Sequence, residues 1–495
     1  MNNAVVTASA AEVDAATQLP AKRLPHRVIN RKHSTRRRWM LISIALAFVG
    51  LLVVLDARLT ASIAMGVLIF TYSMALGYRL WLLTFTINEG GQVHVPDAVA
   101  SELSDRDLPV YTLLIPAYGE PRVIGKLLAA IGSLDYPAHK LDVKLLLEAD
   151  DQPTIRAVMN VKLAHYIEVV LVPPGEPRTK PKALNVGLLR ARGEFVTVYD
   201  AEDEPEPLQL RRAVAAFHYL DANADSGRSS VACLQARLEF FNHGQNTLTR
   251  WFTIEYLTWF AHILPALAAR ELPIPLGGTS NHFRRDVLDE VGGWDPYNVT
   301  EDADLGLRLR HLGYAVDVLD SVTAEEANGD FVNWIRQRSR WHKGYIQTAA
   351  VYLRRPRETI RTFGVRGFVS FLLIVGCTPL LSLVNPIVWA LTLMWIVARP
   401  AWIHSIFVPV VYHAGLFCLV VGNAALIYMG IVGTRASRRR DLLLAAITFP
   451  AYWLLMSVAT IKGVIQLLRH PSYWEKTVHG LAPPDSGPSM SESVR

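Results

Sequence analysis

The stretch Glu194–Glu202 reads EFVTVYDAE. An apolar, β-branched run leads directly into Asp200 and Glu202, which indicates a buried strand that ends in an acidic loop. Three earlier runs have the same form: VYTLLIPAY (110–118), DVKLLLEAD (142–150) and YIEVVLVPP (166–174). Helix-like stretches such as RVIGKLLAAIGSL (122–134) separate several of them. This alternation predicts an α/β domain with a largely parallel sheet, whose ligand site lies at the carboxyl ends of the strands.

Apolar segments lie on both sides of this domain, which we assign to residues 105–350. Hydrophobic residues make up 51% of the chain and charged residues 19%, proportions that favour a membrane protein. Residues 39–86 contain two apolar runs, each about long enough to cross a hydrocarbon core of roughly 30 Å. The preceding stretch from Lys22 to Arg38 is basic. The positive-inside rule therefore predicts a two-helix transmembrane hairpin and a cytoplasmic catalytic domain.

The two ends of the chain and the second apolar region complete the predicted organisation. Residues 365–468 are predicted to form interfacial and transmembrane helices, and the number of spans and the side of the C-terminus stay open. Residues 1–38 lack helical periodicity and are predicted to be a disordered basic tail, and residues 469–495 a C-terminal tail. Because the basic patches flank apolar spans, we expect an integral protein of the bacterial inner (plasma) membrane that binds membrane lipids and no nucleic acid.

Three loops at predicted strand ends carry candidate donor-binding residues. In PAYGE (116–120), Tyr118 could stack on a planar ring and Glu120 could accept hydrogen bonds from its edge. In LEADD, Asp150 and Asp151 could bind a ligand or cap the next helix. The loop PPGEPRTKPKALN (173–185) carries Arg178, Lys180 and Lys182, which could neutralise phosphates or form a solvated basic loop.

The acids after the fourth strand indicate a metal site. Asp200, Glu202 and Asp203 lie on one predicted turn and could share a hard divalent cation, Mg²⁺ or Mn²⁺. Such a cation would stabilise a diphosphate leaving group. An acidic surface loop is the alternative, although burying several acids without a cation would be costly.

Two further motifs precede the second apolar region. Thr300-Glu301-Asp302 stands directly before a predicted helix, so Asp302 could be a helix cap or a base that takes a proton from a hydroxyl. QRSRW (337–341) could read sugar hydroxyls and stack on a sugar face, or could anchor the chain to lipid headgroups.

In this order the motifs resemble those of membrane-bound family 2 glycosyltransferases of the cellulose, hyaluronan and chitin synthase type. The family pattern is an early aspartate, a DxD, a TED and a QxxRW. This chain has Asp150 or Asp151, then Asp200-Ala201-Glu202, then Thr300-Glu301-Asp302, then Gln337, Arg340 and Trp341. The resemblance covers about residues 105–350, and the flanking apolar segments suit the same family.

The resemblance implies a GT-A fold and an inverting, metal-dependent transfer from a nucleotide sugar, usually a UDP-sugar, to a growing β-linked polysaccharide that leaves through the protein's own helices. The alternative is the addition of one sugar to a lipid acceptor. A third reading is an inactive scaffold or transporter. The resemblance also implies accessory export subunits as a further class of partner.

The resemblance also implies roles for individual residues. The residues it assigns are Tyr118, Glu120, Asp150, Lys182 and Asp200 for the nucleotide sugar; Asp200 and Glu202 for Mg²⁺ or Mn²⁺; Asp302 as general base; and Gln337, Arg340 and Trp341 for the acceptor and diphosphate. GGTSNHF (277–283) is expected to line the acceptor site.

The chain departs from the family pattern in two places. Its second DxD acid is Glu202, so Asp203 is an alternative metal ligand, and the FxVTxK sequence of cellulose synthases is absent. Arg338, His342 and Lys343, the neighbours of the QxxRW residues, are expected to face lipid headgroups.

Overall fold

The computed structural model describes residues 5–24, 35–223, 228–400, 403, 408–436, 439–471, 473–478 and 480–482. Within them the strands form one mixed sheet in the order β1-β4-β3-β2-β5-β8-β7-β9-β6. The strands are β1 Val5–Thr7, β2 Tyr111–Ala117, β3 Leu141–Glu148, β4 Ile167–Val172, β5 Phe195–Val198, β6 Glu204–Pro205, β7 Val231–Phe240, β8 Asn281–Arg284 and β9 Ala315–Glu325.

The first half of the sheet is parallel and the second half is mixed. β1, β4, β3, β2 and β5 pair in parallel, β8 is antiparallel to β5 and β7, and β9 is parallel to β7. The strands of the parallel half are apolar and largely buried, as expected for a sheet that helices cover on both faces. The predicted α/β domain with a largely parallel sheet is confirmed, and the carboxyl ends of β2, β3 and β5 meet at one edge.

Helices of two kinds surround this sheet. Those that belong to the sheet domain are α4 Asp97–Glu102, α5 Ile124–Gly132, α6 Gln152–Met159, α7 Lys180–Leu189, α8 Gln209–Ala222, α9 Thr247–Thr258, α10 Leu264–Ala269, α11 Arg285–Val291, α12 Glu301–His311 and α13 Phe331–Leu353. Those outside it are α1 Ala10–Arg23, α2 Thr35–Leu55, α3 Ala57–Glu89, α14 Pro356–Phe371, α15 Cys377–Ala398, α17 Pro409–Ala436, α18 Leu443–Ile447 and α19 Phe449–Arg469.

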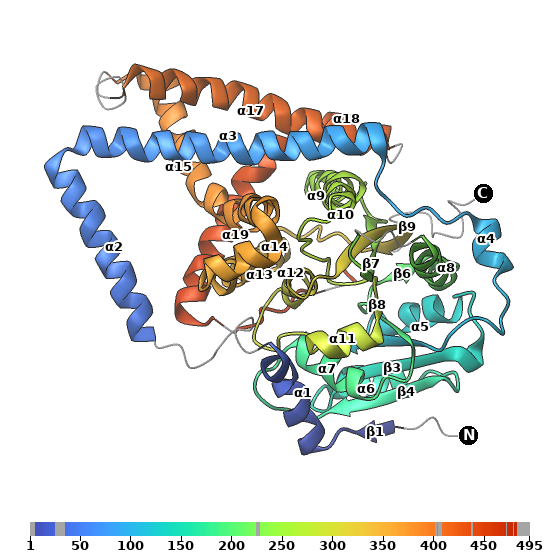
Figure 1. Cartoon of the computed structure of the whole chain (residues 1–495). Helices are drawn as coiled ribbons and strands as arrows, with labels where there is room; N and C mark the ends of the chain where they lie inside the picture. The colour runs from blue at the N-terminus through green and yellow to red at the C-terminus, as the bar shows by residue number, and fades with distance from the viewer. Residues whose placement is uncertain are drawn as a thin grey trace.

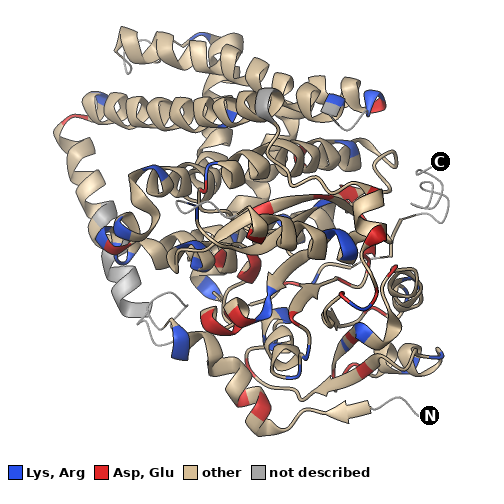
Figure 2. Cartoon of the chain, turned by 45° about the vertical axis from the view of Figure 1, so that its right-hand side comes forward, with Lys and Arg blue, Asp and Glu red and all other residues tan. Residues whose placement is uncertain are grey.

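Four helical segments of the described chain are long and apolar enough to cross a membrane: Ala57–Ile87, Pro356–Ala398, Pro409–Arg435 and Phe449–Arg469. α3 and α17 lie side by side on one side of the sheet domain (Figure 1). Charged residues concentrate in the sheet domain, while these two helices carry few (Figure 2). A kink at Gly364, where φ is 70°, divides α14 near its middle. The membrane-facing part of the chain thus stacks on one side of the sheet domain.

α19 stays beside the sheet domain along its whole length. Near its start, the Tyr452 hydroxyl donates a 2.6 Å hydrogen bond to Glu255 on α9. Near its end, a Cβ on Gly463 would lie 2.6 Å from the carbonyl oxygen of Ser339 on α13, so glycine permits the close approach of the two helices. Just beyond α19, the Pro471 carbonyl accepts a hydrogen bond from Gln347 of α13. Both ends of α19 therefore contact the sheet domain, despite an apolar composition that would suit a membrane span.

The prediction of a disordered tail over residues 1–38 is wrong for residues 5–23, and for residues 35–38, which form the start of α2. β1 adds a parallel edge strand to β4. α1 begins with a capping box between Ser9 and Glu12 and packs on α7, where Asn185 donates a hydrogen bond to the Ala16 carbonyl. This segment is ordered by edge pairing and capping rather than by an apolar periodicity. Residues 1–4, 25–34 and 483–495 lie outside the described chain.

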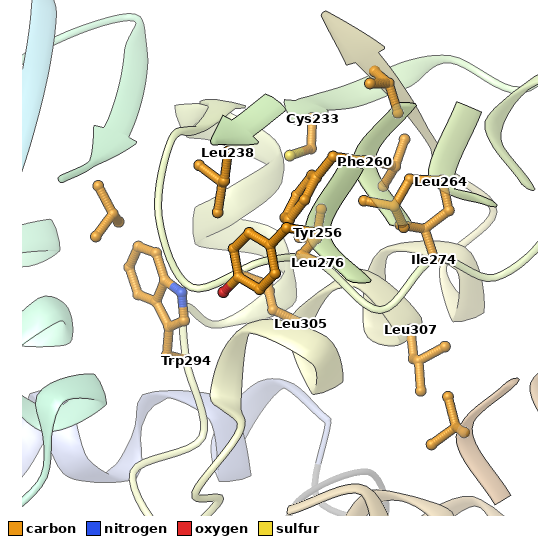
Figure 3. Close-up of a cluster of buried hydrophobic side chains, with 14 of the residues drawn as sticks. Cys233, Leu238, Tyr256, Phe260, Leu264, Ile274, Leu276, Trp294, Leu305 and Leu307 are labelled. Carbon is orange, nitrogen blue, oxygen red and sulfur yellow. The ribbon is translucent and has the colours of Figure 1, made fainter. Parts of the chain in front are cut away.

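The larger of two hydrophobic clusters connects the sheet domain to the outer helices. In Figure 3, Tyr256 and Phe260 lie next to Leu276 and Leu305, beside the strand residue Cys233. The same cluster continues into α14, α18 and α19. Because it is continuous, this core fixes α12 and α13 against the membrane-facing helices, and the candidate site lies at that junction.

Candidate active site

The loop after β5 presents two of its three acids to the open edge of the sheet. Asp203 is turned inward: its Oδ2 accepts the Asp200 N–H at 2.7 Å and the Thr279 hydroxyl, and it is 1% exposed. Asp203 therefore shapes the turn, while Asp200 and Glu202 are more accessible. Of the two alternatives for the second acid of this motif, the geometry favours Glu202 as the residue that faces a ligand.

Lys180, at the start of α7, is the cation that contacts this loop. Its Nζ lies 2.5 Å from Asp200 Oδ1 and donates a 2.8 Å hydrogen bond to the Gly278 carbonyl. Lys182, which the resemblance placed beside the nucleotide, is fully buried and lies 3.4 Å from Glu148. The first turn of α7 thus places Lys180 against the acidic loop and Lys182 at the sheet edge beside Glu148. The role of Lys182 in nucleotide binding stays a prediction.

Negative charge is in excess around the acidic loop. Burial, together with Asp200 and Glu202, raises the pKa of Asp203 well above its usual range. Glu325 at the end of β9, which sequence reasoning did not single out, is affected in the same way: burial raises its pKa, and the neighbouring acids raise it further. Several carboxylates that resist ionising together are a fit for a divalent cation with oxygen ligands.

Asp200 and Glu202 could hold such a cation only together with a ligand. Within the described residues, no group of three or more His, Cys, Asp or Glu side chains is placed to hold a metal ion by itself. A cation bound by two carboxylates would complete its coordination with water and with the phosphates of a substrate, as Mg²⁺ commonly does. The two carboxylates of Asp200 and Glu202 therefore suit a metal ion that binds together with a diphosphate.

The loops after β2 and β3 form the next part of the edge. Gly119, with φ of 64°, donates its N–H to Asp151, and the Asp151 side chain also caps α6 by accepting from Thr154 N at 3.3 Å. Asp151 is thus a structural cap, and Asp150 is left at the edge in a 2.9 Å ion pair with Arg178. Tyr118 is half exposed beside it.

Asp302 lies at the N-terminus of α12, between the acidic loop and a cavity. This cavity, of about 180 Å³, is lined by Asp302, Tyr256 and Trp341 among others. We call it the acceptor cavity, because the family resemblance expects the acceptor beside Asp302 and Trp341. A Cβ on Gly278 would lie 3.2 Å from Asp302 Oδ2 and 3.8 Å from Lys180 Nζ, so the glycine permits all three to converge. Burial raises the pKa of Asp302, and Lys180 opposes that rise. A carboxyl with a raised pKa beside a cavity has the properties of a general base.

Asp304, two residues further along α12, has a different environment. It is fully buried and pairs with Arg308 at 2.8 Å within the same helix. Burial raises the pKa of Asp304 to about 7, against the effect of Arg308. Asp304 is therefore part of the fold, whereas Asp302 is free to face a substrate.

The three QxxRW residues all lie on α13, but each contacts a different part of the protein. Trp341 stacks with Tyr256 at a centroid distance of 6.2 Å and lines the acceptor cavity. Arg340 donates to the Glu475 carbonyl at 2.9 Å and lies over the Trp474 ring. Gln337 accepts a 2.9 Å hydrogen bond from Asn328 and is not among the residues that line the cavity. The structure therefore brings Trp341 to Asp302, and Arg340 to the C-terminal segment.

The prediction that Arg338, His342 and Lys343 face lipid headgroups is wrong. Arg338 is 4% exposed and pairs with Glu255. His342 lines the acceptor cavity, and burial lowers its pKa to about 3. Lys343 is fully buried and donates a 2.5 Å hydrogen bond to the Tyr473 carbonyl. α13 is enclosed by α19 and the sheet domain, so its basic residues are used internally.

A C-terminal segment, residues 473–478 with 480–482, crosses the mouth of the site. Lys476 donates to the carbonyl oxygens of Tyr118 and Gly119, the latter at 2.8 Å, and its Nζ lies 3.4 Å from Glu120. Sequence reasoning treated this region only as a tail. The signal that could have identified it is YWEKT at 473–477, an aromatic and charged cluster directly after the last apolar run.

Comparison with known proteins identifies this domain. The family model described as glycosyltransferase like family 2 matches residues 109–344. A probable glycosyltransferase of Bacillus subtilis, YdaM, is 28% identical over 57% of this chain and 66% of its own length. A β-monoglucosyldiacylglycerol synthase of Synechocystis is 27% identical over 60% of this chain and 64% of its own.

A plant relative and one solved structure extend the comparison. A probable glucomannan 4-β-mannosyltransferase of Arabidopsis thaliana is 25% identical over 60% of this chain and 54% of its own length. The chain thus spans from about half to just under two thirds of these relatives. A mannosyltransferase of Pyrobaculum calidifontis, solved with GDP-Man and Mn²⁺, has a TM-score of 0.52 and 20% identity, and the match covers 82% of this chain and 98% of that one. That likeness establishes the GT-A fold, and residues 109–344 match the glycosyltransferase like family 2 model.

Proposed function

We propose that this protein transfers a sugar from a nucleotide sugar to the hydroxyl of an acceptor that approaches from the membrane side, with inversion at the anomeric carbon. One observation carries the proposal: Asp302 stands between the acidic loop and the acceptor cavity. Lys180 bonds to Asp200 and to the Gly278 carbonyl, and Gly278 packs directly against the Asp302 carboxylate. A donor on one side and an acceptor on the other would meet at a single carboxylate.

The reaction follows from that arrangement. The acceptor hydroxyl oxygen attacks the anomeric carbon, and its proton passes to the Asp302 carboxylate. The bond from the anomeric carbon to the phosphate oxygen breaks, and its electron pair leaves with the nucleoside diphosphate. Lys180 and Arg340 supply positive charge on the side where that charge develops. Burial, which raises the pKa of Asp302, makes it a stronger base than an exposed aspartate.

We assign a divalent cation, Mg²⁺ or Mn²⁺, to Asp200 and Glu202. When bound, it would neutralise the diphosphate of the donor. The excess of carboxylates around Glu325 supports this assignment. Tyr118, Glu120 and Asp150 would hold the nucleotide base, as the family resemblance implies, and Lys182 would lie nearby. The resemblance favours a UDP-sugar, while the solved fold neighbour holds GDP-Man and Mn²⁺.

For the acceptor we propose a lipid, which was the alternative to a polysaccharide in the prediction from the sequence. A second cavity of about 160 Å³ lies among α3, α15, α17 and α19, and its walls are mainly aliphatic. Several of its polar side chains donate hydrogen bonds to backbone carbonyls, as in Ser382 to Thr378 and Asn385 to Trp453, while Arg79 donates to the Thr378 hydroxyl. A glycan in transit would need hydrogen-bonding partners, so this wall suits a hydrocarbon chain better.

A β-linked polysaccharide is the second candidate acceptor. The stacked pair of Trp341 and Tyr256 in the acceptor cavity supports it, because aromatic rings stack on sugar faces. The Arabidopsis relative is named for glucomannan and the Synechocystis relative for a glycolipid. The relatives therefore do not decide between the two candidates.

We further propose an even number of membrane crossings. β1 and α1 pack on the sheet domain at one end of the chain, and residues 473–478 do so at the other. α2, α3, the part of Pro356–Ala398 after the Gly364 kink, and α17 would cross, and α19 would lie along the interface. With the basic stretches on the catalytic side, that side is the cytoplasm, and the membrane is the bacterial inner membrane.

Product analysis tests the function. Full-length protein in membranes receives labelled UDP-glucose, UDP-N-acetylglucosamine or GDP-mannose with Mn²⁺, and label is followed into organic-extractable and high-molecular-weight fractions. We expect one donor to label an extractable lipid with an inverted anomeric centre. Long polymer would favour the second candidate, and label in neither fraction with any donor would favour an inactive scaffold. Asp302→Asn, assayed in parallel, marks the background.

A further inference from the structure

Arg79 on α3 lies where the two cavities meet. Three residues line both the acceptor cavity and the aliphatic cavity among the helices: Arg79, Thr378 and Trp453. We call the second space the helix cavity and these three residues the neck. A ligand that occupied both cavities would pass the guanidinium of Arg79.

The charge of Arg79 is poorly satisfied by its surroundings. Its Nη2 donates a 2.7 Å hydrogen bond to the Thr378 hydroxyl. Its Nε is buried and has no hydrogen-bond partner within the described residues. The carboxylate that acts most directly on it, Glu255, is already paired with Arg338 and accepts from Tyr452. Glu255 is thus taken up by Arg338, and Arg79 has no ion pair of its own within the described residues.

Such a charge at this position calls for an anionic partner. An ionisable side chain within a membrane helix is costly, faces the protein interior, and marks a ligand or ion pathway by default. Burying a guanidinium that lacks a counter-charge is unfavourable. Arginine also matches phosphate and carboxylate oxygens through several N–H groups at once.

The side chains close to Arg79 are of the kinds that gather at the level of lipid headgroups. One residue before it, Tyr78 stacks with Trp81, and the guanidinium of Arg270 lies 4.9 Å from the Trp81 ring. Tyr and Trp gather at the level of the headgroups. The helix cavity is walled by side chains such as Leu68, Leu381 and Val384, which suit hydrocarbon.

We propose that Arg79 binds the anionic group, a phosphate or phosphodiester, of an amphiphilic acceptor. The hydrocarbon of this ligand lies in the helix cavity and its hydroxyl-bearing head reaches Asp302 through the acceptor cavity. This inference rests on the proposed function and narrows its acceptor to an anionic lipid. The transfer step is unchanged, since Arg79 orients the acceptor and takes no proton.

A binding experiment tests the site without requiring transfer. Full-length protein in maltoside detergent micelles, which carry no phosphate, is titrated with a short-chain fluorescent phosphatidylglycerol, and with inorganic phosphate as the source without a lipid tail. The variants are Arg79→Gln, Arg79→Lys and the matched control Arg270→Gln, an arginine beside Trp81 that lines neither cavity. Nucleotide binding and thermal stability are measured on each variant.

We expect Arg79→Gln to weaken phosphatidylglycerol binding about tenfold or more, Arg79→Lys to retain part of it, and Arg270→Gln to match the wild type. Nucleotide binding should survive in all variants, and inorganic phosphate should not displace the lipid. Equal binding by wild type and Arg79→Gln would overturn the inference, as would equal binding of a neutral lipid or displacement by inorganic phosphate. If Arg79-dependent binding is present but no lipid receives sugar, the proposed acceptor fails while this site stands.

Discussion

The donor side and the acceptor side of the site differ in how far their charged side chains are paired. On the donor side, Asp200, Glu202 and Asp203 share one turn, Lys180 pairs with Asp200, and burial together with the two neighbouring acids raises the pKa of Asp203. On the acceptor side, Arg338 is matched by Glu255, and the aromatic rings of Tyr256 and Trp341 cover much of the wall. One side is short of positive charge, while the other satisfies its own charges except at Arg79.

This difference indicates how each side recognises its ligand. Because the donor side is electrostatically incomplete, it gains most from a ligand that brings a cation with it, as a metal-bound diphosphate does. The acceptor side needs no such ligand, so shape, stacking and the single charge of Arg79 decide what fits. Asp302 lies on the boundary, and changes to the two sides should separate donor binding from transfer.

The largest effect is expected at that boundary. Asp302→Asn removes the proton acceptor but leaves the donor side intact, so transfer should fall by about 10²–10⁴-fold. Donor binding, followed by nucleotide titration, should change little. Near-normal turnover in this variant would mean that Asp302 is not the base.

Asp304→Asn is the matched comparison within the same helix. It would leave Arg308 buried without its counter-charge, and breaking a buried pair from one side typically costs about 3–5 kcal/mol. We expect a large loss of thermal stability with little change in turnover per folded molecule. If both variants lose stability alike, the loss of activity in Asp302→Asn cannot be assigned to chemistry.

The second prediction concerns the donor side alone. Glu202→Gln should weaken the apparent affinity for Mn²⁺ by at least about 10–100-fold, the range found when a residue that only supports a metal ligand is lost. Titration of activity with Mn²⁺ after chelation measures this shift, and excess metal should restore much of the rate. Glu204→Gln, two residues further on, is the control. Full activity of the wild type without metal would contradict the assignment.

Much of the donor side could be predicted from the sequence, because its residues follow strands directly. The apolar run of β5 leads straight into Asp200, and parallel strands bring their carboxyl ends to one edge. Lys180 was recognised only as one of three cations in its loop. Which of them reached the acids depended on the phase of α7, where Lys180 and Lys182 point to different neighbours.

The acceptor side was less predictable, because distant segments build it. Arg338, His342 and Lys343 resemble headgroup contacts beside an apolar run, and only the packing of α19 on α13 shows that they are internal. Two donor-side residues were equally hard to predict: Glu325 and Lys476 lie far along the chain from the residues they approach, and no local pattern connects them. The pairing of β1 with the edge strand β4 could not be predicted either, because three residues are too few to show a periodic pattern.

The third prediction tests whether the C-terminal segment belongs to the donor side. Lys476 bonds to the backbone of the Tyr118 loop and lies near Glu120, so Lys476→Gln should loosen the segment. We expect the KM for the nucleotide sugar to rise about tenfold, the scale of one charge-assisted hydrogen bond, with kcat nearly unchanged. Steady-state kinetics with varied donor measures this split. The exposed Lys162→Gln should have no effect, and a fall in kcat alone would place Lys476 elsewhere in the cycle.

The smallest expected effect is on the pH dependence of stability, through the buried His342 on the acceptor side. His342 is buried beside Arg338, and burial lowers its pKa to about 3, far below an ordinary value of about 6.5. Between these values the unfolded chain binds a proton at His342 and the folded chain does not. Stability from this residue is thus present above about pH 6.5 and falls with decreasing pH, by up to about 1.4 kcal/mol per pH unit. His342→Gln should flatten the decline of the unfolding midpoint between pH 6.5 and 5, while the exposed His139→Gln should not. Identical declines in wild type and His342→Gln would show that this wall tolerates the added charge, and the contrast between the two sides would then be weaker than the geometry indicates.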